Sequence, residues 1–261
     1  MNLNTIDDIA AELFLALRNQ QTIAPLTDKF PEININDAYQ ISRKFLSLRE
    51  EQGEKIVGKK IGVTSSVVQE MLGVNQPDFG FLTNTMQVLN KSDFSIQGSL
   101  IQPRAEAEIA FILKDDLHGP GITKEDVIQA TAKILPCFEI VDSRILDWNI
   151  KIQDTVADNA SCGIFVLGEG ECPPDKFSMN TLEVEVHKNG EFLSSGVGSA
   201  VQGHPAEAVA WLANTLGEYD ISLLKNEIIL SGSLVPLEPA VPGDKFLMEL
   251  KGVGTCEINF I

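Results

Sequence analysis

Two glutamates stand one residue apart in an otherwise apolar segment. Glu106 and Glu108 lie in the stretch 106–113, whose other members are Ala, Ile, Phe and Leu. Alternate residues of a β-strand share a face, so both carboxylates would point the same way while the opposite face is wholly apolar. A strand of this composition is typical of one that is buried on both faces. The pattern therefore indicates two carboxylates on a buried face, which needs a chemical reason.

A third carboxylate, Glu139, lies in a second apolar segment, 135–142, with apolar neighbours on both sides. If the two segments pair, three carboxylates converge. Like charges about 4 Å apart repel by roughly 4 kcal/mol per pair at an effective dielectric near 20. Such a cluster takes up protons unless a cation neutralises it. Ligation by oxygen alone favours Mg²⁺ or Mn²⁺, with positions left open for water or substrate.

An exposed edge strand is the alternative interpretation of the first segment. In that case Glu106 and Glu108 simply face water, and their spacing alone does not exclude it. The apolar frame around Glu139 is what favours a metal site, because a lone buried carboxylate is costly.

Other residues could complete such a site. Lys60 lies between Gly58 and Gly62, and glycines let the backbone approach a ligand closely. A lysine beside a metal could hold an anionic substrate or transfer a proton. A surface lysine in a turn is the alternative. Asp78, in the turn-like segment 76–80, and Ser161, in a loop of small polar residues, are further candidates, although each could be only a turn residue.

Composition narrows the class of protein. The 261 residues carry 37 acidic and 20 basic side chains, a formal charge of −17, which argues against a nucleic-acid-binding surface. No apolar run reaches the roughly 18 residues of a membrane-spanning helix, and the acidic N-terminus does not resemble a signal peptide. We expect a cytoplasmic protein. The four cysteines form no C-x-x-C pair, so a zinc–thiolate site is not expected.

The elements that must position these residues change in type along the chain. The first third reads as helical, with Thr5 and Asn36 as expected helix caps and a third helix ending near Gly73. Strands dominate later, interrupted by helices over 123–134 and 205–217, the second capped by His204. We predict an α+β fold with a mainly helical portion over 1–75 and a strand-rich domain over 76–261. The predicted strands are 106–113, 135–142, 163–167, 182–187, 226–230, 245–250 and 255–261.

Several stretches together resemble one known family. The chain is similar to the bacterial 2-keto-4-pentenoate hydratases, in the hydratase/decarboxylase branch of the fumarylacetoacetase-like superfamily, and the resemblance runs essentially end to end. Singly, none of the motifs is specific. The matching stretches are 58–64 (GKKIGVT), 76–80 (QPDFG), 102–108 (QPRAEAE), 143–148 (SRILDW), 154–163 (DTVADNASCG), 203–205 (GHP) and 252–255 (GVGT).

The resemblance implies a fold, a site and a reaction. The fold would be a mixed β-sheet roll or barrel, as in the fumarylacetoacetase C-terminal domain. Glu106, Glu108 and Glu139 would bind Mg²⁺ or Mn²⁺, Lys60 would act as acid and base, and Asp78 and Ser161 would orient substrate or water. The reaction would add water to 2-hydroxypenta-2,4-dienoate to give 4-hydroxy-2-oxopentanoate, in meta-cleavage catabolism of aromatic compounds.

Related activities remain open at this level. The alternatives are 4-oxalocrotonate decarboxylase and a hydratase of a longer 2-oxo-alkene-dioate, whose pocket would want an extra cation for the second carboxylate. An acylpyruvate-type hydrolase is disfavoured because no histidine precedes His118. A non-catalytic subunit is disfavoured by the complete set of candidate site residues. The resemblance also implies a homo-oligomer, a small anionic 2-oxo acid as substrate and a possible association with a related decarboxylase.

Overall fold

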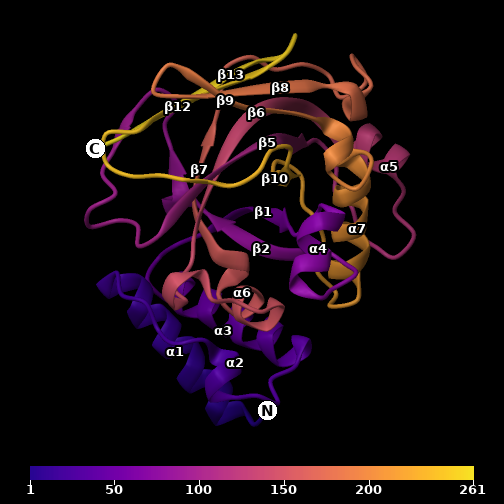
Figure 1. Cartoon of the computed structure of the whole chain (residues 1–261). Coiled ribbons are helices and arrows are strands. Elements are labelled where there is room, and N and C mark those ends of the chain that lie inside the picture. The colour runs from indigo at the N-terminus through magenta and orange to yellow at the C-terminus, as the bar shows by residue number, and fades with distance from the viewer.

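The computed structural model describes residues 1–261, apart from the side chains of residues 66, 67 and 71. The helices α1 (Leu3–Asn19), α2 (Leu26–Lys29) and α3 (Ile35–Glu51) gather at one end, with α6 (Ile152–Ala157) packed against α3 (Figure 1). The expected caps Thr5 and Asn36 are wrong by three and two residues, respectively. Asn2 caps α1 by accepting from the Thr5 amide, and Asn34 caps α3. Asn34 and Asp37 bond reciprocally, a capping box that Asn36 could not form.

The larger sheet has eight strands and curls into a half-barrel. Its order is β2-β1-β10-β5-β6-β7-β3, with β11 added to β5. Most pairs are antiparallel, but β1–β10 and β3–β7 are parallel, so the sheet is mixed. The strands are β1 (Ile56–Gly62), β2 (Asp78–Thr83), β3 (Gln87–Val88), β5 (Pro103–Leu113), β6 (Thr131–Asp142), β7 (Cys162–Leu167), β10 (Ile228–Ser233) and β11 (Glu238–Pro239).

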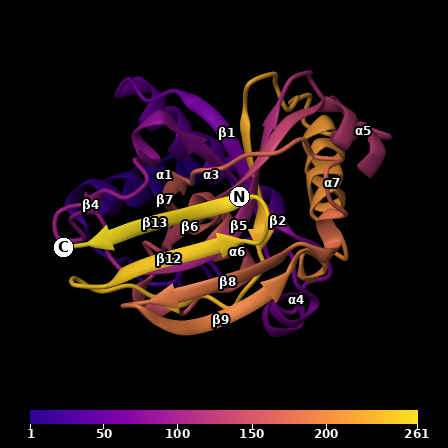
Figure 2. The same cartoon turned by 90° about the horizontal axis from the view of Figure 1, so that it is seen from above.

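A second sheet of five strands lies against the outer face of β6. Its order is β4-β13-β12-β8-β9, and Figure 2 shows the last four of these strands side by side. Phe246 on β12 joins the layers, because its ring meets Phe138 of β6 and Phe260 of β13 edge-on, with centroids 6.2 and 6.0 Å apart. The strands are β4 (Asp93–Phe94), β8 (Glu183–Lys188), β9 (Glu191–Val197), β12 (Lys245–Leu250) and β13 (Gly254–Phe260).

Three further α-helices are α4 (Ser66–Leu72), α5 (Lys124–Ala130) and α7 (Pro205–Gly217). The ends predicted at Gly73 and at His204 are confirmed, since Gly73 is the C-cap of α4 and the His204 ring accepts from the Ala206 amide. Short 3₁₀ turns cover Asn84–Met86, Leu146–Trp148, Asn159–Ser161, Met179–Thr181 and Gly198–Ala200.

Some predicted boundaries are wrong. The helix expected over 123–134 ends at Ala130, because Thr131 already pairs with Leu113 as the first residue of β6. The segment 76–80 is not a turn: β2 begins at Asp78 and pairs with β1. Strand β9 was not predicted, and its seven residues are mostly exposed, without a clear apolar face.

Strand β5 is buried on both faces, as predicted. Ala107, Ile109 and Phe111 belong to the large core between the sheets and helices. Ala110 belongs to a smaller apolar cluster inside the curled sheet, together with Leu135 and other residues. The exposed-edge alternative for Glu106 and Glu108 is therefore wrong, because β5 lies between β10 and β6.

The predicted α+β class is confirmed. The boundary at residue 75 stays a prediction, although β1, which precedes it, is an inner strand of the larger sheet.

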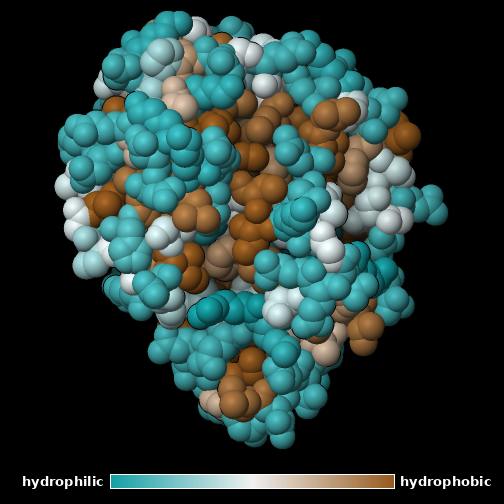
Figure 3. All heavy atoms as spheres, turned by 180° about the vertical axis from the view of Figure 1, so that it is seen from behind, coloured by the Kyte–Doolittle hydropathy of each residue, from teal (hydrophilic) through white to brown (hydrophobic). Residues whose placement is uncertain are grey.

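One face of the molecule is mostly hydrophilic, with apolar side chains exposed along a hollow near its middle (Figure 3). No helix in the described part of the chain has the length and apolar character needed to span a membrane.

Candidate active site

Glu106, Glu108 and Glu139 meet inside the curled sheet. In the β5–β6 ladder, Glu106 is directly opposite Glu139, and Glu108 follows two residues on along the same face. One carboxylate oxygen from each residue lies within 4.8 Å of the others. Glu108 and Glu139 are almost fully buried, at 0% and 1% exposure. The predicted metal site requires that the two strands pair in this register and that the carboxylates are buried, and the structure has both features.

The three carboxylates lack enough partners of their own. Glu108 Oε2 accepts the Gly232 amide at 2.8 Å, but Glu108 Oε1 and Glu139 Oε2 have no partner within the described residues. Burial, reinforced by the charge of Glu139, raises the pKa of Glu106 to about 8 and that of Glu108 well above its ordinary value. The cluster thus has carboxylate oxygens without hydrogen-bond partners, and burial disfavours ionisation of all three carboxyl groups at once. Both features are those expected of a site for a divalent cation.

Cation binding should therefore release protons. With pKa values raised in the metal-free protein, Glu106 and Glu108 hold protons near pH 7 that a divalent cation must displace. We expect about one to two protons to be released per Mg²⁺, and the affinity to weaken as pH falls below about 8. Calorimetric titrations in buffers of different ionisation enthalpy measure this number. Binding without proton release would mean that the carboxylates are already ionised.

Lys60 and Asp78 lie beside this cluster on β1 and β2. Both are 2% exposed, so the surface-turn alternative for Lys60 is wrong. Lys60 Nζ is 3.1 Å from Glu139 Oε1. Asp78 lies opposite Gly62 in the ladder, where a Cβ would come within 2.3 Å of Asp78 Oδ1. A glycine at position 62 therefore makes the room that Asp78 occupies.

The charges of this pair follow from their surroundings. Burial alone would lower the pKa of Lys60, but attraction to Glu139, Asp78 and Glu106 outweighs it and raises the pKa. Lys60 is therefore an ammonium in the metal-free site. Burial raises the pKa of Asp78 to about 6, against the opposing effect of Lys60. Asp78 Oδ1 is buried with no hydrogen-bond partner among the described residues, which leaves it available to a ligand.

Ser161 ends a strained turn. Asn159, Ala160 and Ser161 all have left-handed backbones, with φ of 54°, 50° and 53°. Such conformations are costly outside glycine and are found where a site needs them. The Asn159 side chain clamps the turn to β2, accepting from the Phe81 amide at 2.8 Å and donating to its carbonyl at 3.0 Å. Ser161 Oγ lies 3.1 Å from Thr155 Oγ1.

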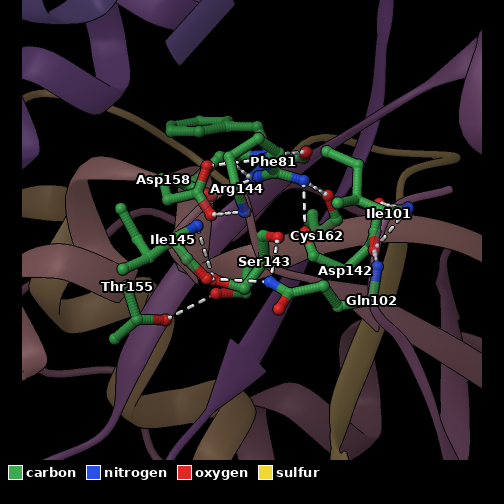
Figure 4. Close-up of polar contacts among 12 residues, drawn as sticks. Phe81, Ile101, Gln102, Asp142, Ser143, Arg144, Ile145, Thr155, Asp158 and Cys162 are labelled. Carbon is green, nitrogen blue, oxygen red and sulfur yellow. Dashed lines mark hydrogen bonds and ion pairs between the residues drawn. The ribbon is translucent and has the colours of Figure 1, made fainter. Parts of the chain in front are cut away.

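Arg144 holds the same turn from the other side, a contact that the sequence did not reveal. Its guanidinium is fully buried and donates to the Asp158 carboxylate, the Asp158 carbonyl and the carbonyls of Asp142 and Cys162 (Figure 4). A buried arginine whose donors bind backbone carbonyls fixes the chain around it. The sequence shows only that Arg144 lies within the matched stretch 143–148, and this position alone does not indicate a role for its side chain.

The strand end at 231–233 supports the carboxylate cluster. Its backbone amide at Gly232 binds a carboxylate of the chain itself, Glu108, and not a ligand. A Cβ at position 232 would come within 2.4 Å of Thr64 Oγ1, and its φ is +108°, so glycine is needed there.

A cavity of about 320 Å³ is lined by four of the six predicted site residues, namely Lys60, Asp78, Glu106 and Ser161. Its wall carries both polar and apolar side chains. The polar lining residues are Lys60, Asp78, Arg104, Glu106, Thr155 and Ser161, and the apolar ones include Val63, Val68, Leu72, Val141, Trp148, Ile150, Ala160 and Leu237.

Comparison with known families agrees with this geometry. Residues 57–261 match the model of the fumarylacetoacetate (FAA) hydrolase C-terminal domain. The chain belongs to the FAA hydrolase family. The predicted resemblance and the FAA C-terminal-like fold are thereby confirmed.

Curated relatives of this FAA hydrolase family member lie in the expected branch. A 2-hydroxyhexa-2,4-dienoate hydratase from Comamonas testosteroni is 58% identical over 98% of this chain and 97% of the relative. A 2-hydroxypent-2,4-dienoate hydratase from Pseudomonas putida is 53% identical over 85% of this chain and all of the relative. A 2-keto-4-pentenoate hydratase from Paraburkholderia xenovorans strain LB400 is 42% identical, covering 97% and 94%.

Solved structures of related enzymes have the same fold. The 4-oxalocrotonate decarboxylase from Pseudomonas putida G7, complexed with magnesium and adipate, has a TM-score of 0.97 and 34% identity, covering 100% of this chain and 99% of that one. A fumarylpyruvate hydrolase from Pseudomonas aeruginosa, with a TM-score of 0.62 and 12% identity over 78% of this chain and 88% of that one, shares the fold.

Proposed function

We propose that this chain is a metal-dependent hydratase that converts 2-hydroxypenta-2,4-dienoate and water into 4-hydroxy-2-oxopentanoate. The observation that carries the proposal is the cluster of Glu106, Glu108 and Glu139, of which Glu106 lines a cavity together with Lys60 and Asp78. The names of relatives 42–58% identical support the same reaction class. The solved decarboxylase structures hold magnesium or calcium, and we propose Mg²⁺ or Mn²⁺ here.

The reaction moves two protons and one hydroxyl group. The 2-hydroxyl proton of the dienol is lost and C5 gains a proton, which gives an α,β-unsaturated ketone. Water then adds across that double bond, with its hydroxyl at C4 and a proton at C3. Negative charge develops on the C2 oxygen in both steps. A divalent cation held by Glu106, Glu108 and Glu139 would supply Lewis-acid stabilisation of that charge.

The chain's own residues supply the proton transfers. Lys60 is buried and protonated, so its ammonium can donate to the carbon chain and be reprotonated. Asp78 and Ser161 line the same cavity and are candidates for holding and activating the water. An unpartnered Asp78 oxygen is a suitable proton acceptor, because nothing within the described residues competes for it.

A second candidate function is 4-oxalocrotonate decarboxylase, which the TM-score of 0.97 favours. That reaction would use the same charge stabilisation but lose CO₂. The relative that is 58% identical is named for a six-carbon dienoate. A homo-oligomer and association with a related decarboxylase remain proposals on the same family grounds.

Ultraviolet absorbance of freshly prepared 2-hydroxypenta-2,4-dienoate tests the function. Metal-dependent loss of the dienol band, abolished by chelator and yielding 4-hydroxy-2-oxopentanoate, is the expected result. No loss with this dienoate, accompanied by CO₂ release from 4-oxalocrotonate, would replace the hydratase assignment with decarboxylase.

A further inference from the structure

We infer that Arg104 binds the carboxylate of the substrate. This inference rests on the proposed function and names the group that holds the substrate anion in the same site. Arg104 is a side chain to which neither the charge cluster nor the proton transfers assign a role.

Arg104 is placed next to the carboxylate cluster. It lies two residues before Glu106 on β5, so both side chains leave the same face, with Cα atoms about 7 Å apart. Both line the cavity. Among the described residues, Arg104 has no ion-pair or side-chain hydrogen-bond partner, whereas Lys60 is already 3.1 Å from Glu139. The guanidinium is therefore the cation that the cavity leaves for an anionic ligand.

An aromatic ring holds this guanidinium in place. Its central carbon lies 4.7 Å from the centroid of the Trp148 ring. Trp148 is itself fixed, since its indole N–H donates to the Gln102 carbonyl at 2.9 Å, while the Gln102 amide donates to the Ser143 and Ile145 carbonyls (Figure 4). Stacking on a ring uses the flat face of a guanidinium and leaves its N–H donors free, in the fork that matches a carboxylate.

The charge balance of the cavity requires another cation. Three glutamates, a divalent cation, protonated Lys60 and ionised Asp78 leave one net negative charge before any substrate enters. An anionic substrate would meet repulsion there without Arg104. A carboxylate bound near Glu106 lies within reach of the seven-atom side chain of Arg104, two residues away. The Arg104 guanidinium can therefore both bind the substrate carboxylate and offset the net negative charge of the cavity.

Binding can be measured without turnover, using Trp148 as the reporter. In a Trp211→Phe background, Trp148 is the remaining tryptophan, since the chain has two. The probe is 2-oxopentanoate, a saturated monocarboxylate, with its amide as the uncharged control, and Mg²⁺ is present throughout. We expect Arg104→Met to weaken binding of the acid about 10- to 100-fold and to leave binding of the amide nearly unchanged. Arg104→Lys should recover part of the loss, and Arg43→Met, at an exposed arginine, should change nothing.

Kinetics separate the two possible partners of Arg104. With 2-hydroxypenta-2,4-dienoate, Arg104→Met should raise KM about 10-fold or more and change kcat by less, because the carboxylate is bound equally in the ground and transition states. The dicarboxylate 2-hydroxyhexa-2,4-dienedioate is tested alongside the monocarboxylate with both proteins. If the variant instead binds the monocarboxylate normally and loses only the dicarboxylate, Arg104 serves the far end and the inference is wrong. If the wild type turns over neither compound, the proposed function fails, but the fluorescence titration still decides the role of Arg104. Circular dichroism verifies folding, and Arg104→Gln replaces the Met variant if the latter is unfolded.

Discussion

Replacing Glu108 by glutamine should abolish metal-dependent turnover and, at the same time, stabilise the metal-free protein. Turnover is lost because an amide oxygen is a poor substitute for a buried carboxylate ligand. Stability rises because burial raises the pKa of Glu108 well above its ordinary value, so the folded state holds a proton that the unfolded chain gives up. Glutamine removes that cost, and its side-chain oxygen can still accept the Gly232 amide.

The sign and pH window of this gain are specific. A raised carboxyl pKa costs nothing below the unfolded value near 4.5 and costs progressively more as pH rises above it. The advantage of Glu108→Gln should therefore be absent near pH 4 and present near pH 7, where the variant should have the higher Tm.

Thermal unfolding with and without Mg²⁺ tests both parts. Wild-type Tm should rise with Mg²⁺ as mass action requires, and the variant should lose most of that rise. The control is Glu183→Gln, at an exposed glutamate of β8, for which no change is expected. A Glu108→Gln protein with normal turnover and a normal response to Mg²⁺ would contradict the metal site.

The carboxylate cluster could be predicted because strand periodicity decides it. Alternation places Glu106 and Glu108 on one face whatever the rest of the chain does, and two apolar segments close in sequence usually pair. The register that sets Glu106 opposite Glu139 follows from the pairing of β5 and β6 along their whole length. Local pattern and tertiary structure agree here, which is why the sequence sufficed.

The remaining parts of the site depend on contacts that are distant in sequence. Strand β10 inserts between β1 and β5, and no local pattern indicates that residues 228–233 belong there. Asp78 appeared to be in a turn because Pro77 and Gly80 surround it, but pairing with β1 makes the segment a strand. The Arg144–Asp158 contact spans 14 residues and anchors a turn whose left-handed backbone includes Ala160, which no propensity would suggest.

The adjacent lysines Lys59 and Lys60 on β1 allow a test of proton transfer by Lys60. Lys60→Met should reduce kcat by about 10²- to 10⁴-fold, the range that a proton-transferring side chain contributes, while the protein still binds Mg²⁺. The affinity for Mg²⁺ should rise, because the ammonium that lies 3.1 Å from Glu139 no longer repels the cation. Single-turnover kinetics and calorimetric titration measure the two effects separately, and a variant that loses Mg²⁺ binding would make Lys60 a structural residue only.

Lys59 is the matched control, because it is equally buried but leaves β1 on the opposite face. Its Nζ lies 2.6 Å from Glu227 Oε1, far from the carboxylate cluster in the ladder. Lys59→Met leaves Glu227 without its buried partner and should cost about 3–5 kcal/mol of stability, with kcat and Mg²⁺ affinity preserved in the folded fraction. Lys60→Met should show the reverse pattern, with catalysis lost. If both variants lose kcat to the same degree, damage to β1 explains the loss, and Lys60 has no separate role in proton transfer.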